Sequence, residues 1–256
     1  MQFPSGETLV SYGLSSHLNM RLGDAEARTF GEPFVALPGR GSWGCMELNG
    51  SHEVIAPMRN SEKSGDITIA LARFELNHRI SATHRTVNID GDNAEWAATD
   101  DALFVGEKSQ AQATLRCSCD DRNVYFLVEV LDEAISRDDY VNILLSPANE
   151  GDKLTSAARR IKVSHSGLKS TDVYAGGWRE TDMGVTVQAA YDGTISDNGD
   201  TDNGYLVEVA VPRSQLDLAS GEILVNLVLF DSQGGEDAIS PTSSRSIAGW
   251  VPVAGL

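Results

Sequence analysis

Short runs with a side-chain period of two recur along the whole chain, and this feature constrains the fold more than any other. The run NVYFLVEV (123–130) places Val124, Phe126 and Val128 on one face of a strand, because successive side chains of a strand point to opposite faces. The run YLVEVAV (205–211) alternates in the same way. No long segment repeats apolar residues at the 3.6-residue period of a helix. The chain is therefore expected to be all-β.

Polar turns separate the predicted strands. In the first segment, strands are expected at 8–12, 33–37, 45–48, 53–57 and 67–74, with a hairpin turn at Asn49-Gly50, since both turn residues accept positive φ. In the later part, strands are expected at 112–117, 124–130, 140–145, 160–164, 186–191, 205–211 and 224–230. Residues 213–218 are the one helix-like piece. This pattern predicts a β-sandwich, preceded by a small antiparallel β segment.

Acidic side chains concentrate in the later part of the chain. The protein has 37 Asp and Glu against 20 Lys and Arg, a net charge of -17. Residues 1–86 carry a net charge of -1 and residues 87–256 one of -16. Residues 77–86 (NHRISATHRT) are polar and basic, which is typical of a linker. We therefore expect a β-rich segment at 1–76, a linker at 77–86 and a sandwich domain at 87–256.

The charge also excludes two classes of partner. Phosphate backbones need Lys and Arg to neutralise them, and an acidic surface repels anionic lipid. No stretch of about 18 apolar residues is available to span a bilayer. We expect neither a nucleic-acid nor a membrane partner.

Catalytic motifs are absent from the sequence. There is no G-x-S-x-G, no H-E-x-x-H and no glycine-rich phosphate loop, and no two carboxylates are paired by their spacing as a glycosidase needs. The odd set Cys45, Cys117 and Cys119 is too sparse for a disulfide framework, and Cys117 and Cys119 are expected to be small buried residues on one strand face. This chain alone is therefore expected not to be catalytic.

Several blocks of the later part follow one another in a characteristic order. They are Ile89-Asp90-Gly91 with Trp96 behind it, DDRNVYFLVEVLDE (120–133), DDYVNILL (138–145), GYLVEVAVPRSQL (204–216) and the run 225–231. This order resembles carbohydrate-binding module family 9, whose members are β-sandwiches appended to secreted glycosidases. The resemblance covers residues 87–253 and implies a polysaccharide or oligosaccharide ligand and calcium sites. Trp96 and Trp250 are expected to pack against the sandwich.

The resemblance also implies a sugar site, in which two tryptophans clamp a sugar and polar residues bond its hydroxyls. The first clamp position falls near Ser136 and the second near Ser244, just before Arg245, so neither position is aromatic. The family's acidic residue corresponds to Asn142, and its arginine on the next strand corresponds to Lys162. The blocks that indicate the fold match the family, whereas the residues at the two clamp positions do not.

Other aromatic residues are candidates for the ring surface that the two clamp positions lack. Tyr174 and Trp178 lie in YAGGWR, where we expect a Gly-bearing loop that exposes both rings. Together with Asn142, Lys162 and Arg245 they form the predicted ligand site. The alternative for Trp178 is a loop anchor, and for Asn142 and Lys162 an exposed amide and a solvated lysine.

The loop DNGDTDNG (197–204) gathers the oxygen ligands that hard cations prefer. An EF-hand is excluded, because Val209 stands where its twelfth-position Glu would be and no flanking helices are expected. Asp197, Asp200 and Asp202 are the predicted ligands of a structural Ca²⁺. The alternative is a solvated turn, since Asp and Asn tolerate left-handed backbone.

Two runs of the first segment have a second resemblance. GETLVSYG (6–13) and LGDAEARTF (22–30) resemble the strand and the Asp-box turn of sialidase-type β-propeller blades, although Leu22 and Glu26 replace the Ser and Gly of the box. The resemblance covers residues 6–76 and implies the end of a propeller. A small independent β-domain is the alternative.

These features predict a non-catalytic carbohydrate-binding accessory module of a larger secreted glycan-active enzyme, extracellular or periplasmic, with a catalytic domain upstream in the same polypeptide. The start MQFPSGETLV lacks a signal-peptide pattern, so we expect a piece of a longer secreted protein rather than an intracellular one. The alternatives are a spacer domain without a ligand site and the C-terminal fragment of a sialidase-like glycoside hydrolase.

Overall fold

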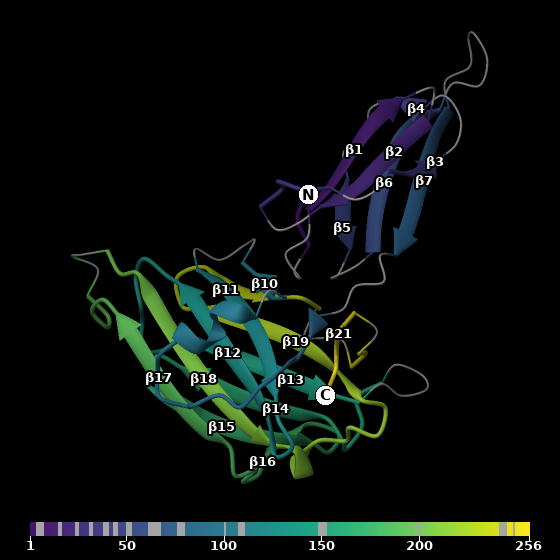
Figure 1. Ribbon diagram of the computed structural model, residues 1–256. Coiled ribbons are helices and arrows are strands. Elements are labelled where there is room, and N and C mark those ends of the chain that lie inside the picture. The colour runs from purple at the N-terminus through teal and green to yellow at the C-terminus, as the bar shows by residue number, and fades with distance from the viewer. Residues whose placement is uncertain are drawn as a thin grey trace. The chain divides into compact units, whose positions relative to one another are not determined.

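The computed structural model divides into two compact units, Met1–His78 and Arg79–Leu256. It describes residues 1–3, 8–14, 17–23, 26–30, 33–37, 41–42, 46–49, 53–60, 68–75, 80–99, 101–106, 111–147, 153–197, 199, 201–240, 245–247 and 249–256. Figure 1 shows strands throughout both units. The all-β prediction is confirmed.

The N-terminal unit contains two small antiparallel sheets. One consists of β1 (Thr8–Leu14), β2 (His17–Gly23) and β3 (Phe34–Leu37), and the other of β4 (Gly41–Ser42), β5 (Glu47–Asn49), β6 (Glu53–Asn60) and β7 (Thr68–Glu75). Residues from both sheets share one buried cluster, formed by Phe3, Leu9, Leu18, Met20, Val54 and Ala56. A propeller blade is a single four-stranded sheet. The propeller resemblance therefore gains no support from this arrangement.

The predicted hairpin of the N-terminal unit is present, because β5 pairs antiparallel with β6 and Asn49 lies opposite Glu53. Gly50 itself lies outside the described residues, as does Cys45. Strand β2 was not predicted. Its end, Leu22-Gly23, falls in the run interpreted as an Asp-box turn.

The C-terminal unit is a sandwich of two sheets (Figure 1). Sheet I has the order β10-β11-β12-β18-β17, with β9 also on β11, and sheet II has the order β16-β15-β14-β13-β19-β21-β8, with β20 also on β19. The strands of sheet I are β9 (Thr83–His84), β10 (Leu103–Val105), β11 (Gln112–Cys119), β12 (Asn123–Leu131), β17 (Thr186–Asp192) and β18 (Gly204–Pro212). Those of sheet II are β8 (Ile80–Ser81), β13 (Tyr140–Ser146), β14 (Arg159–Ser164), β15 (Gly167–Tyr174), β16 (Trp178–Glu180), β19 (Glu222–Asp231), β20 (Gly235–Ala238) and β21 (Val251–Ala254).

The inward faces of both sheets form one apolar core. Phe126 and Val128 of β12, with Val209 of β18, come from sheet I and contact a cluster that includes Ile143 and Leu227 of sheet II. These are the positions that the period-two pattern assigned to one strand face. Cys117 and Cys119 are both buried free thiols, as expected.

Each sheet also has a covered patch on its outer face. Trp96, in the short 3-10 helix η1 (Ala94–Ala98), packs on Tyr125 and Leu127 of sheet I. Trp250 packs on Leu144 and Val228 of sheet II. Both tryptophans are packing residues, as predicted.

The division between the units differs from the predicted one. Residues 80–84, expected in the linker, form β8 and β9, and Ile80 is buried in the sandwich core. Residues 77–79 lie outside the described part. These two short strands were not predicted, because the run is polar and basic and Ile80 is its only large apolar residue.

Helices in the described residues are limited to η1 and η2 (Arg213–Gln215), at the position of the predicted helix-like piece. Within that part of the chain, none has the length and hydropathy needed to cross a membrane.

Candidate functional site

The outer face of sheet II gathers most of the predicted ligand residues. On β13 and β14, Val141, Ile143 and Ile161 point into the core, so that the residues between them point outward. Asn142 lies directly opposite Lys162 in the register of these two strands. The two residues predicted from the family's site are therefore neighbours on one surface.

A stacked aromatic pair borders Lys162. The rings of Tyr140 and Phe230 stack with centroids 4.8 Å apart, and Lys162 Nζ lies 3.4 Å from the Tyr140 centroid on that ring's face. Burial lowers the pKa of Lys162, and the positive charges of Lys169 and Arg160 lower it further. The ammonium group is thus held at an aromatic surface rather than in bulk water.

A second aromatic group lies at the outer end of the sheet. Trp178 and Tyr174 make an edge-to-face contact with centroids 5.5 Å apart, and the Arg160 guanidinium lies 5.2 Å from the Trp178 centroid. Arg160 Nε donates to Asp172 Oδ2 at 3.0 Å, and the Ser170 hydroxyl donates to the same oxygen. This network fixes the cation against the indole ring.

The position of Tyr174 and Trp178 corrects the sequence prediction. They were expected in a loop, whereas Tyr174 ends β15 and Trp178 begins β16, and the two residues pair across the hairpin. The glycines Gly176 and Gly177 lie in the turn between them. Trp178 is half-buried and packs against the Trp250 patch. Both rings therefore have fixed positions on a strand pair.

The remaining predicted positions lie at the border of this face. Arg245 is exposed, and its carbonyl accepts a hydrogen bond from Leu154 N, next to the Trp250 patch. Ser136 is half-buried and carries no ring, and Ser244 lies outside the described residues. The position predicted for the first clamp residue thus carries a small polar side chain.

One polar atom of the face has no partner. Asn142 Oδ1 is buried and accepts no hydrogen bond. A buried carbonyl oxygen without a donor costs free energy.

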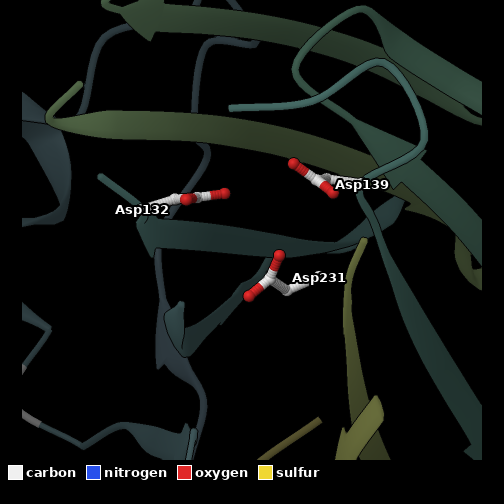
Figure 2. A group of neighbouring side chains, drawn as sticks. All are labelled: Asp132, Asp139 and Asp231. Carbon is white, nitrogen blue, oxygen red and sulfur yellow. The ribbon is translucent and has the colours of Figure 1, made fainter. Parts of the chain in front are cut away.

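A second site lies at the end of the sandwich, where Asp132, Asp139 and Asp231 meet. Each offers a carboxylate oxygen within 4.8 Å of the other two, and Figure 2 shows the carboxylates turned toward one another. The side chains come from three strand ends: Asp132 follows β12, Asp139 precedes β13 and Asp231 ends β19. All three residues are buried.

Backbone amides orient these carboxylates. Asp139 accepts from the amides of Ser136 and Ser232, one on each oxygen. Asp132 Oδ1 accepts from Ala134 N at 2.9 Å, and Asp231 Oδ1 accepts from Gln233 N at 2.8 Å. The cluster is therefore held in place before any ligand binds.

The surroundings of Asp132 disfavour its charged form. Burial raises the pKa of Asp132 to about 6, and the charges of Asp139 and Asp231 add to that rise. Burial and the same three carboxylates raise the pKa of the nearby Tyr205 hydroxyl well above its ordinary value. Asp132 therefore keeps its proton to a higher pH than a free carboxyl group does.

The predicted calcium loop is described only in part. Asp202 is buried, with Oδ1 accepting from Thr194 N at 2.6 Å and Oδ2 from Ile135 N at 2.7 Å. Asp197 Oδ1 accepts from Gly199 N. Asp200 lies outside the described residues, so the loop site stays a prediction.

Sequence reasoning missed the cluster of Asp132, Asp139 and Asp231. The sequence places these acids at or beside the ends of expected strands, but it does not show that they meet. An antiparallel pairing of β13 with β19 puts the start of one beside the end of the other. No spacing along the chain carries that information.

Comparison with known proteins identifies the fold of the C-terminal unit. No family model and no curated protein sequence matches the chain. Among solved structures, it is similar to a carbohydrate binding module family 9 from Caldicellulosiruptor kristjanssonii in complex with cellotriose, with a TM-score of 0.53 and 16% identity over 69% of this chain and 92% of that one. The glucose complex of the Caldicellulosiruptor kristjanssonii module matches with the same TM-score and identity, over 69% of this chain and 94% of that one. The matched share corresponds to the length of the C-terminal unit, which therefore has the family 9 sandwich fold.

Proposed function

We propose that the C-terminal unit is a carbohydrate-binding module that holds an oligosaccharide or polysaccharide on the outer face of sheet II. The observation that carries this proposal is the meeting of Asn142, Lys162, Arg160 and Trp178 on one face of rigid strands. Sugars need such a combination, with aromatic carbon surface for the ring and fixed polar groups for the hydroxyls. The similar solved structures hold cellotriose and glucose, which makes β-glucans the first ligands to test.

In this proposal the polar residues supply most of the affinity. The side-chain amide of Asn142 bonds one sugar hydroxyl, and Lys162 donates to another. Trp178 replaces the missing tryptophan clamp with a single ring, which Arg160 holds from one side. A one-ring site binds more weakly than a two-ring clamp, because each ring contact contributes about 0.5–1.5 kcal/mol.

The test is affinity electrophoresis on a polysaccharide panel, followed by calorimetry with cellotriose. Wild type is expected to bind, and Asn142→Ala, Lys162→Ala and Trp178→Ala are each expected to lower the affinity about 10-fold, the equivalent of one lost hydrogen bond or ring contact. Leu131→Ala is the matched control, since Leu131 is 64% exposed and belongs to sheet I. Equal affinity in all variants would place the ligand elsewhere.

The spacer hypothesis is the second candidate, and Ser136 at the first clamp position favours it. A spacer is retained by no polysaccharide. We also propose the wider setting, in which the unit is the extracellular or periplasmic accessory domain of a larger glycan-active enzyme. The coding sequence on either side of the chain tests that part: an adjoining glycosidase domain supports it.

A further inference from the structure

Half of the positive charge of the acidic segment 87–256 lies in one short stretch of sheet II. Residues 153–179, which include β14 and β15, carry six Lys and Arg and a single acid, Asp172. The rest of the segment carries six Lys and Arg against 27 Asp and Glu. This stretch therefore has a charge opposite to that of its surroundings, and it includes the strand that carries Lys162.

Three of these cations form a basic patch, which consists of Arg160, Lys162 and Lys169. Arg160 and Lys162 are two positions apart on β14, so both point to the outer face of sheet II. Lys169 is the extra residue of β15 where its register against β14 shifts beside Lys162. Burial lowers the pKa of Lys162, the charges of Lys169 and Arg160 lower it further, and Asp172 raises it. The ammonium group of Lys162 therefore has two cations and one carboxylate as its charged neighbours.

That carboxylate is already engaged by other groups. Asp172 Oδ2 accepts from Arg160 Nε at 3.0 Å and from the Ser170 hydroxyl at 3.1 Å. Arg160 is thus largely neutralised, while its guanidinium lies on the ring of Trp178. The charge of the patch that is left over belongs to the two lysines.

Neither lysine has a counter-charge. The residues directly opposite Lys162 on the two neighbouring strands are Asn142 and Ser170, and both are uncharged. Lys169 Nζ donates to the backbone carbonyl of Arg137 at 3.2 Å. Among the residues that the structure describes, neither lysine forms an ion pair with a carboxylate. Two like charges held together without a counter-charge favour an anionic ligand.

The nearest exposed acids lie outside the patch. Glu180 lies opposite Asp172 on the edge strand β16, and Glu236 lies opposite Phe230 on β20. Each is separated from β14 by at least one intervening strand, which places its strand about 10 Å or more from β14. Salt at 0.1 M screens exposed charges over a similar distance. The charge that a small ligand meets at Lys162 is therefore positive.

We propose that the outer face of sheet II selects an acidic oligosaccharide, in which a carboxylate or sulfate group pairs with Lys162 and Lys169 while a sugar ring lies against Trp178. This inference rests on the proposed function and narrows it to one class of glycan. The similar solved structures hold the neutral sugars cellotriose and glucose, so the preference is a property of the residues of this chain.

The size of the ligand follows from the charge around the patch. A short acidic stretch contacts the lysines and gains a charge-assisted hydrogen bond, which is about twice as strong as a neutral one. A long polyanion such as a nucleic acid would also extend over the acidic remainder of the unit, which repels it. The site therefore suits a few acidic sugars rather than any extended polyanion.

The experiment is titration calorimetry of the full chain with three trisaccharides that share one β-1,4-glucose backbone. They are cellotriose, its derivative with carboxylates at C6 and its derivative with sulfate esters at C6. At 0.1 M salt, at least one acidic trisaccharide should bind about 10-fold more tightly than cellotriose, and the tighter of the two identifies the anionic group. Raising the salt to 0.5 M should reduce this preference several-fold and leave cellotriose binding unchanged.

Lys162→Gln isolates the charge, because glutamine keeps an N–H donor and loses the ammonium group. This variant should lose the preference for the acidic trisaccharide and keep the affinity for cellotriose within about 3-fold, which also shows that it folds. Lys162→Arg should keep the preference. Arg122→Gln is the matched control, since it removes one positive charge from an exposed turn between β11 and β12 of sheet I and should change nothing.

Three outcomes would overturn the inference alone. One is cellotriose binding as tight as that of both acidic trisaccharides. Another is a preference for the acidic trisaccharide that Lys162→Gln retains. The third is displacement of that trisaccharide by inorganic polyphosphate at equal charge concentration, which would indicate an anion site without sugar recognition. If none of the three trisaccharides binds, both this inference and the proposed function are wrong.

Discussion

Glu208 holds together the two parts of the run 89–96, the Ile-Asp-Gly turn and Trp96. This carboxylate is fully buried in sheet I. Its Oε2 accepts from the amides of Asp90 and Gly91 at 2.9 and 2.7 Å, and its Oε1 accepts from Trp96 Nε1 at 2.8 Å. The Ile-Asp-Gly turn and the tryptophan behind it are therefore two parts of one anchor that closes the outer face of sheet I.

Glu208→Ala should lower the free energy of unfolding by about 3–5 kcal/mol, because the buried Trp96 Nε1 and two partly buried backbone amides lose their common acceptor. Urea unfolding of the full chain, followed by circular dichroism, measures the change. Glu95→Ala is the matched control. Glu95 accepts a single bond, from Asn88 N, and its loss should cost about 1 kcal/mol. Similar losses in both variants would contradict the anchoring role.

The strands that carry Asn142 and Lys162 were predictable from the sequence, because both contain alternating apolar residues. Their role in binding a ligand stays a prediction. Asp132, Asp139 and Asp231 meet only through the register of β13 on β19 and the packing of sheet I on sheet II. That information is three-dimensional, and no local pattern contains it.

At the scale of elements, most strands with a regular apolar face were predictable, and strands without one were not. Strands β11, β12, β13, β14, β17, β18 and β19 follow the expected ranges closely, because most of them bury one apolar face. Strand β15 (GLKSTDVY) was missed, since Lys169, Ser170 and Asp172 interrupt any alternation of apolar residues. Its backbone pairing with β14, rather than its side chains, makes it a strand.

The short strands β8 and β9 attach the start of the C-terminal unit to both sheets. Strand β8 pairs in parallel with β21, and β9 pairs in parallel with β11. Ser118 Oγ also donates to the carbonyls of Thr83 and Arg85. These few residues cover an edge in each layer.

A fragment of residues 79–256 should therefore be more stable than one of residues 87–256. The shorter fragment loses the buried Ile80 and exposes the edges of β11 and β21, which should cost about 3 kcal/mol or more. Thermal unfolding by circular dichroism compares the two, at equal concentration and in excess Ca²⁺. Equal melting temperatures would show that β8 and β9 add nothing to the fold.

At the scale of the whole molecule, the two units differ in core size and in charge. The N-terminal unit has a small shared cluster around Met20 and Val54, while the C-terminal unit has an extended core between two larger sheets. Stability rises with the fraction of surface that a domain buries, and small domains bury less. Most of the negative charge also lies in the C-terminal unit.

Scanning calorimetry of the full chain should accordingly give two transitions, the first from the N-terminal unit. Raising the salt concentration from about 10 mM to 0.5 M should move the second transition upward, because it screens the self-repulsion of the acidic unit. The 79–256 fragment should reproduce the second transition alone. A single cooperative transition of the full chain would contradict independent unfolding.

The parallel pairing of β8 with β21 has a mechanical consequence. Val253 lies beside Ile80, and Ala254 beside Ser81, so the first and last strands of the C-terminal unit run side by side in the same direction. A pull on the two ends of this unit would slide these strands past each other and load their hydrogen bonds together rather than unzip them singly. The unit should consequently resist tension along the polypeptide far better than tension across the sheet.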